Sequence, residues 1–383
     1  VSGGNEFKKN DLNYQDRIYL NNGKGEFSKS INLIQANNIS GGVVKAMDFD
    51  KDGDIDIFIG GRLDPRNYPT PVDSQLLENI DGKLVDVSSE KAIGFKELGM
   101  VTDAIWSDYD NDNDQDLIVV GEWMAITIFK NESNSFKKVK NEILKNSEGW
   151  WFSIEQGDFD NDGDMDFIAG NLGLNYKYKT TKDTPFDVYY EDFDSNGSND
   201  IVLGYYNFGK HYPVRGFSCS AQQVPELKKE FKKYDIFASL QIDKVYDKKK
   251  LNKALYYKTQ TFASSFVENL GNGVFKISDL PIEAQFSSVN DIVVKDLNKD
   301  GNLDVIIAGN LFVSEIETPR NDGGTGLILL GDGKNNFKPL DHKTAGFFVN
   351  KDVKKIKLLF DKNQQLILIG NNNDDLQVFE FQK

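Results

Sequence analysis

Cysteine and histidine are almost missing from this sequence, with one cysteine (Cys219) and two histidines among 383 residues. A disulfide framework needs paired cysteines, and a zinc site usually needs several cysteine or histidine ligands. The composition therefore leaves almost no material for either. Because a secreted domain of this size does not depend on disulfides, the cysteine count does not assign a compartment.

Long apolar runs are missing as well. No stretch approaches the ~20 residues that a membrane-spanning helix needs. The chain opens at Val1 without an initiator methionine, a signal-peptide pattern or a lipidation cysteine. We expect an excerpt of a longer protein or a processed product, with any targeting segment outside this sequence.

Positive charge is the scarcer sign, because 45 Lys and Arg stand against 60 Asp and Glu and leave a formal charge of −15. An acidic surface gains no counterion release from nucleic acid and is repelled by anionic lipid, so the net charge disfavours both as partners. Hydrophobic residues make up 39% of the chain and aromatics 12%, which is enough for a buried core.

What the sequence does have is one acidic pattern in five copies. Oxygen-bearing side chains occupy positions 1, 3, 5, 7 and 9, and position 6 is Gly or Asn. The copies are Asp48, Asp50, Asp52, Asp54 and Asp56; Asp108, Asp110, Asp112, Asp114 and Asp116; Asp158, Asp160, Asp162, Asp164 and Asp166; Asp192, Asp194, Asn196, Ser198 and Asp200; and Asp296, Asn298, Asp300, Asn302 and Asp304.

This pattern has the chemistry of a calcium loop. Ca²⁺ takes six to eight oxygen ligands, whereas Mg²⁺ resists dehydration and seldom uses all-protein cages. A Gly or Asn at position 6 permits the positive φ that wraps a loop around an ion, and position 7 would offer its backbone carbonyl. Acidic turns without metal are the alternative, but five sets of unpaired neighbouring carboxylates would repel one another. We predict about five Ca²⁺, with the Asp192 loop the weakest because Asn196 replaces a carboxylate.

The loops are not EF-hands, because position 12 is apolar in each copy instead of a bidentate Glu. Residues on both sides of each loop are β-branched or apolar, so we expect a strand, the loop and a second strand. A second hairpin with an Asn/Gly turn follows at a distance, as in Asn21–Gly25 and Asn269–Gly273. Two hairpins make one four-stranded antiparallel blade, and blades repeated at this spacing predict a β-propeller.

We therefore predict an all-β fold, a single propeller of about seven blades over residues 1–383. A partly helical insertion over 209–260 interrupts it, with Pro225 at a helix start. This insertion caps the propeller, docks a partner or covers its channel, and the nearby His211 and Cys219 are expected to be incidental. The predicted blades are 1–29 (partial, its other strands upstream of Val1), 42–90, 101–140, 151–182, 188–278, 288–340 and 345–383 (without metal).

These loops resemble those of the FG-GAP/VCBS repeat family, which includes the integrin α-subunit propellers. Gly121–Met124, Gly170–Asn175 and Leu280–Ala284 look closer to bacterial surface proteins of the UnbV/cartilage-acidic-protein-like branch. The Gly-Ala-Pro element of the family name is absent, and no UnbV tail segment is visible. The resemblance implies a calcium-loaded propeller and an extracytoplasmic location, at the cell surface, the outer membrane or in the periplasm.

Propeller symmetry brings equivalent positions of different blades to one rim. Polar or aromatic residues follow the second strand of each unit, and they are candidates either for ligand binding or for turn and blade packing: Arg62, Glu122, Trp123, Asn171, Tyr205, Tyr206, Asn310 and Asn371. Asp103, Asp187 and Asp291 stand five residues before three of the loops, and we expect them to cap turns.

Three functions remain open from the sequence. The first is a calcium-stabilised module of the bacterial surface that binds a protein or a glycan. The second is a glycan-active enzyme such as a polysaccharide lyase, which would need an acid–base pair that the sequence does not localise. The third is an architectural part of an outer-membrane complex.

Overall fold

The computed structural model describes residues 2–30, 33–34, 38–314, 318–361 and 364–380. Antiparallel strands dominate it, and its helices are short, which confirms the all-β class. Within the described ranges, no helix has both the length and the apolar character needed to span a bilayer.

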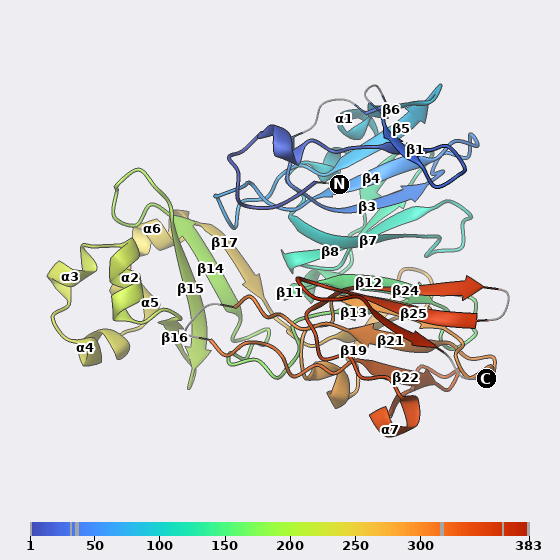
Figure 1. Cartoon of the computed structure of the whole chain (residues 1–383). Helices are drawn as coiled ribbons and strands as arrows, with labels where there is room; N and C mark the ends of the chain where they lie inside the picture. Colours follow the sequence, from blue (N-terminus) through green and yellow to red (C-terminus); the bar gives the residue numbers. More distant parts are fainter. Residues whose placement is uncertain (1, 31–32, 35–37, 315–317, 362–363, 381–383) are drawn as a thin grey trace.

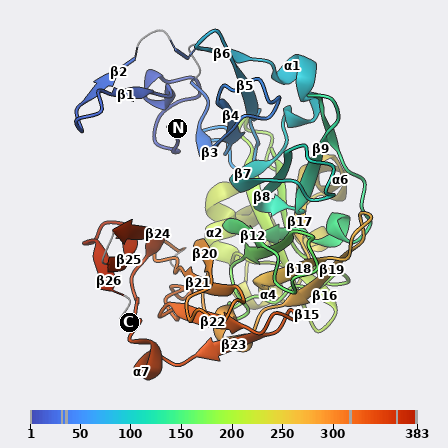
Figure 2. The same ribbon diagram turned by 90° about the vertical axis from the view of Figure 1, so that its right-hand side faces the viewer.

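Five sheets follow one another round an arc (Figure 2). The first contains β3 (Gly41–Met47), β4 (Asp56–Gly61), β5 (Gln75–Ile80) and β6 (Lys83–Asp86). The second contains β7 (Met100–Ser107), β8 (Asp116–Met124), β9 (Thr127–Asn131), β10 (Phe136–Lys138) and β11 (Gly149–Trp150). The third contains β12 (Ser153–Gly157), β13 (Asp166–Gly170), β18 (Ser265–Asn269) and β19 (Phe275–Asp279).

The last two sheets of the arc come from the C-terminal part of the chain. The fourth contains β20 (Asp291–Lys295), β21 (Asp304–Ala308), β22 (Leu327–Gly331) and β23 (Phe337–Leu340), and the fifth contains β24 (Val353–Asp361), β25 (Gln364–Asn371) and β26 (Gln377–Glu380). A small pair, β1 (Tyr19–Asn21) with β2 (Phe27–Lys29), precedes the first sheet. Short helices in the connections are η1 (Leu12–Tyr14), α1 (Ser88–Lys91), η2 (Ile93–Phe95), η3 (Leu144–Asn146), η4 (Ile282–Gln285) and α7 (His342–Ala345).

The hydrophobic core of the arc is divided among the gaps between successive sheets. Phe58 and Phe95 of the first sheet region pack with Trp106 and Phe129 of the second, and the next gaps are filled in the same way. The first strands β3, β7, β12, β20 and β24 contact one another in that order. Sheets that pack face to face around their first strands are the propeller arrangement.

A seventh sheet lies outside this arc and is called the insertion sheet below. It contains β14 (Phe186–Glu191), β15 (Asp200–Asn207), β16 (Lys210–Pro213) and β17 (Leu255–Thr259). The helices α2 (Phe217–Gln223), α3 (Leu227–Glu230), α4 (Tyr234–Ala238), α5 (Ile242–Val245) and α6 (Lys248–Lys253) connect β16 to β17. Figure 1 shows this sheet and its helices projecting to one side of the arc.

The strand pairing corrects two of the expected blade boundaries. β13 pairs with β18, about 100 residues further along, so the predicted units 151–182 and 188–278 are not separate blades. The hairpin at 265–279 completes the sheet that begins at Ser153, and everything between belongs to a longer insertion than 209–260. In the part of the chain that the structure describes, five sheets form the arc, and neither a count of seven blades nor a closed ring is established.

Candidate metal centres and the opposite face

The five acidic loops share one backbone conformation. We number them loop 1 (48–56), loop 2 (108–116), loop 3 (158–166), loop 4 (192–200) and loop 5 (296–304). Position 6 has a φ between 72° and 98° in all five, so Gly or Asn is required there. In each loop the N–H of this residue donates to the carboxylate at position 1, over 2.8 to 3.1 Å. The sequence pattern thus predicted the loop conformation correctly.

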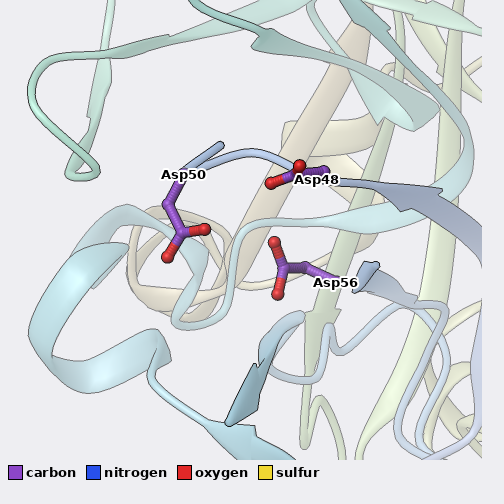
Figure 3. A group of neighbouring side chains, drawn as sticks. All are labelled: Asp48, Asp50 and Asp56. Carbon is purple, nitrogen blue, oxygen red and sulfur yellow. The ribbon is translucent and has the colours of Figure 1, made fainter. Parts of the chain in front are cut away.

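Four of the loops bring three carboxylates together. Ligand atoms within 4.8 Å of one another come from Asp48, Asp50 and Asp56; Asp108, Asp110 and Asp116; Asp158, Asp160 and Asp162; and Asp192, Asp194 and Asp200. Figure 3 shows the loop 1 carboxylates turned toward a common space. Loop 5 has an amide, Asn298, at position 3, and its side chain donates to Asp300 over 2.9 Å.

Burial and neighbouring charge make these clusters unfavourable without a cation. Burial, with neighbouring carboxylates as a smaller cause, raises the pKa of Asp116 to about 7 and that of Asp56 to about 6. Three buried loop oxygens have no hydrogen-bond donor: Asp48 Oδ1, Asp110 Oδ1 and Asp116 Oδ2. A buried acceptor without a partner is costly, and a hard divalent cation would satisfy it. The residues present therefore fit a bound Ca²⁺.

Position 9 also braces the arc. Asp116 Oδ1 accepts the N–H of Asn131 on β9 over 2.7 Å, and Asp56, Asp166 and Asp304 accept equivalent N–H groups of the third strand. The buried carboxylate at the end of each loop thus joins the loop hairpin to the second hairpin of its sheet. A change at position 9 would affect both the metal site and the strand pairing.

Position 7 side chains connect successive loops along one face of the arc. Lys51 of loop 1 pairs with Asp114 of loop 2 over 2.7 Å, and Asn111 of loop 2 donates to Asp164 of loop 3 over 2.6 Å. Loop 2 also receives the ammonium of Lys130, which pairs with Asp110 and, over 2.9 Å, with Asp112. The position 7 side chains of loops 2 and 3 therefore receive contacts from the preceding loop.

Loop 4 belongs to the insertion sheet and has different surroundings. Its third strand, β16, is short and pairs only with the far half of β15, so no strand N–H of β16 reaches Asp200. Gln223 of α2 exchanges two hydrogen bonds with Ile201 instead. Lys250 of α6 donates to the Asp192 carbonyl over 2.8 Å and to Ser195 over 2.7 Å.

At the opposite end of the strands, Arg62, Glu122 and Trp123 do come together. Arg62 and the Tyr68 hydroxyl both contact the Glu122 carboxylate, and Trp123 Nε1 donates to Tyr68 over 2.7 Å. Trp123 is only 4% exposed, and its ring stacks on Phe186 of the insertion sheet at 5.9 Å. The insertion sheet therefore covers this part of the expected rim.

Asn171 and Asn310 are fully buried, which corrects their candidacy as ligand-binding residues. The Asn171 side chain donates to the Thr261 carbonyl and accepts the Trp150 N–H. Asn310 donates to two carbonyls and accepts the Gly324 N–H. Both amides hold turns and neighbouring segments together. This is the turn and blade packing that the sequence allowed as the alternative to ligand binding.

A cavity of about 210 Å³ lies where the insertion sheet meets the arc. Its wall includes the aromatic rings of Trp150, Tyr176, Tyr178 and Phe186, with Arg215 beside them. Trp150 Nε1 is buried and has no acceptor. The sequence does not predict this site, because its residues come from separate strands and connections. The aromatic run Tyr176–Tyr178 is a local signal for it.

His211 was expected to be incidental, but it takes part in a network of side-chain contacts. Its Nε2 lies 3.0 Å from Asp187 Oδ1, and the Tyr256 hydroxyl donates to Asp187 Oδ2 over 3.2 Å. The Tyr206 ring stacks on the imidazole at 4.5 Å. A Cβ on Gly204 would lie 2.2 Å from Asp187 Oδ1 and 2.3 Å from His211 Nε2, so the glycine makes room for the pair.

Comparison with known proteins gives a family match for two stretches. Residues 10–59 and 108–169 match the model of the FG-GAP-like repeat, so these two stretches are similar to that repeat. No curated protein sequence matches the chain.

Two solved structures show distant similarity. One, an Agrocybe aegerita lectin described for specific recognition of non-reducing terminal N-acetylglucosamine, is 14% identical, with 92% of this chain and 85% of the lectin covered at a TM-score of 0.30. The V. cholerae biofilm matrix protein Bap1 is 9% identical, with 91% and 69% covered at a TM-score of 0.33. Similarity at this level carries no argument about the present chain.

Proposed function

We propose that this chain, two stretches of which are similar to the FG-GAP-like repeat, is a calcium-stabilised binding or scaffold module of the bacterial cell surface, of the VCBS type and nearest to the UnbV-like branch. The observation that carries the proposal is the repeated cluster of three carboxylates, with buried oxygens that lack donors in loops 1 and 2 and matching clusters in loops 3 and 4. A bound cation would satisfy these oxygens and offset the repulsion among the carboxylates, and the oxygen-only ligand set selects Ca²⁺ over transition metals.

An extracytoplasmic location follows from the same argument. Calcium modules of extracellular proteins have dissociation constants of about 10⁻⁴–10⁻³ M, far above cytosolic free calcium. At such affinities the carboxylate clusters would bind calcium outside the cytoplasm. In the cytoplasm they would stay without calcium, and their carboxylates would repel one another. We therefore propose that the fold, with its loops filled by calcium, is stable at the cell surface or in the periplasm.

The cavity beside Trp150 is the place where we propose that a ligand binds. Aromatic rings offer stacking faces for a sugar ring, and the unpartnered Trp150 Nε1–H offers one directed hydrogen bond. Among the residues that the structure describes, no carboxylate lines this cavity, and Arg215 contributes a positive charge to its wall. We therefore favour a neutral or acidic glycan over a protein ligand at this position.

A polysaccharide lyase is the second candidate, favoured by one observation. His211, Asp187 and Tyr256 form an acid–base network on the insertion sheet, and Lys258 stands opposite Asp187 in the strand register. A lyase needs a base, an acid and a group that neutralises a substrate carboxylate. These residue types lie on neighbouring strands of the insertion sheet, Asp187 on β14, His211 on β16, and Tyr256 and Lys258 on β17.

Metal analysis and glycan capture test the leading proposal. After dialysis into calcium-containing buffer, the protein should hold several equivalents of calcium, and fewer than two would contradict the metal assignment. Trp150→Phe replaces the indole with a smaller phenyl ring that lacks the Nε1 donor, so it should weaken capture on a glycan array while the melting curve still shows a folded protein. Unsaturated sugar products in a lyase assay, lost in His211→Asn, would favour the second candidate instead.

A further inference from the structure

The net charge of −15 conceals two regions of opposite sign. Residues 208–260, called the basic lobe here, contain 12 Lys or Arg against 5 Asp or Glu, a formal charge of +7. The rest of the chain contains 33 against 55, a formal charge of −22. The expectation that acidity disfavours anionic partners therefore holds for the arc and not for the lobe.

Most lysines of the basic lobe are exposed to solvent. Among them, Lys228, Lys229, Lys232 and Lys233 fall within six residues and are all exposed. Only Lys229 of these four forms an ion pair, with Glu226 at 3.4 Å. Their ammonium groups are therefore largely uncompensated by acidic side chains.

Apolar side chains are exposed on the same lobe. Phe208 is 98% exposed at the tip of the β15–β16 hairpin, and Tyr234 and Ile236 of α4, directly after Lys233, are 66% and 46% exposed. Figure 1 shows the hairpin tip and α4 toward the same lower end of the lobe. Exposed apolar side chains next to clustered lysines are typical of surfaces that bind at a membrane interface.

The backbone conformation of Phe208 is unfavourable for a phenylalanine. It has a φ of 48°, and Gly209 follows with a φ of 72°, which is a two-residue turn of the kind that favours Asn-Gly. A bulky aromatic residue in this conformation is strained, and its side chain contributes no packing because it is almost fully exposed. Neither turn geometry nor the core explains a phenylalanine here, so we look to a partner outside the chain.

We propose that the basic lobe docks the protein on an anionic lipid bilayer, with Phe208 inserted among the headgroups and acyl chains. Lysines near a charged leaflet attract it, and aromatic side chains are favoured at the interface. The acidic arc is compatible with this orientation because the lobe projects from it, and charge beyond about 8 Å is screened at physiological ionic strength. An acidic polysaccharide would use the lysines but would leave the apolar tip without a role.

Vesicle co-sedimentation tests the proposal with the whole chain in calcium-containing buffer. Binding is expected to vesicles of phosphatidylglycerol and phosphatidylethanolamine, and not to phosphatidylcholine vesicles, with a loss at high salt. The variant with Lys228, Lys229, Lys232 and Lys233 changed to Gln should bind at least tenfold more weakly, since each lysine contributes about fivefold. Changing Lys83, Lys96, Lys140 and Lys338, exposed lysines of the arc, to Gln removes the same charge and should have little effect.

Phe208→Asn separates docking from folding. Asn suits the positive φ, so the melting temperature should stay equal or rise, while vesicle binding falls severalfold. No binding to anionic vesicles, equal loss in both lysine quartets, or unchanged binding of Phe208→Asn would each overturn the proposal. Binding of alginate without vesicle binding would assign the lobe to an acidic glycan and overturn it as well.

Discussion

The arc and the insertion sheet use the same acidic loop in different settings, and the difference shows what each setting adds. In the arc, Asp116 joins loop 2 to the second hairpin through the Asn131 N–H, and Asp103 Oδ2 accepts the Ile154 N–H of the next sheet over 3.1 Å. In the insertion sheet, Asp200 has no third-strand donor, and Asp187 pairs with His211 because no following sheet lies beside it. The hydrogen-bond partners of these carboxylates therefore depend on the strands and sheets beside them, and not on the loop sequence.

Calcium removal should have the largest effect and should fall mainly on the arc. At ~1 mM calcium and a dissociation constant of ~10⁻⁴ M, each site adds about 1.4 kcal/mol, or roughly 7 kcal/mol for five independent sites. Calorimetry should show a strong downward shift of the melting temperature on chelation and full recovery when calcium returns. An unchanged transition after verified metal removal would separate the loops from the stability of the fold.

Substitution at position 9 compares the two settings directly. Asp116→Ala removes a metal ligand and the brace to Asn131, and we expect a loss of about 3 kcal/mol in the free energy of unfolding. Asp200→Ala removes a ligand without that brace, so the loss should be about half as large. Urea unfolding in calcium would measure both, and equal losses would show that the third-strand contact adds no stability.

Gly204→Ala should disturb the insertion sheet alone. The added Cβ would collide with Asp187 and His211, at an expected cost of about 1–3 kcal/mol. NMR signals of the His211 ring should shift strongly, while those of the arc stay in place. Gly216→Ala is the matched control, because its Cβ would meet nothing within 4 Å.

The smallest effect should come from the cation beside loop 4. Lys250→Met removes a positive charge next to Asp192 and Ser195, so calcium affinity at loop 4 should rise by about fivefold. Calcium titration of loop 4, followed by backbone NMR of Gly197, would measure it. Lys248→Met, on an exposed residue of the same helix, should leave this affinity unchanged.

The sequence predicted the loops well because their information is local. Oxygens at fixed positions and a Gly or Asn at position 6 determine the backbone of Gly53 or Asn113 regardless of the surrounding sheet. Blade membership is different, since β14 with β15 has the same local pattern as a hairpin of the arc. Only the pairing of Phe167 with Val267 shows that the chain leaves one sheet and returns to it.

The candidate ligand residues show the same limit. A polar residue after a strand, such as Asn310, has the same sequence context whether it faces solvent or holds a buried turn. Its burial depends on Gly324 and Lys351, which are distant in sequence. Trp123 is covered by Phe186 for a similar non-local reason.

The return of the chain from the insertion to β18 has a consequence for the order of folding. A ribosome adds residues from the N-terminus, so β12 and β13 emerge long before β18 can pair with them. Until then, the outer edge of β13 exposes unpaired N–H and C=O groups, as edge strands do. The pairing of β18 with β13 is slow because it closes a long loop. It becomes faster once the insertion has folded and brought the two ends of that loop together. We therefore expect the third sheet to be the last of the first three to become protected from hydrogen exchange during synthesis.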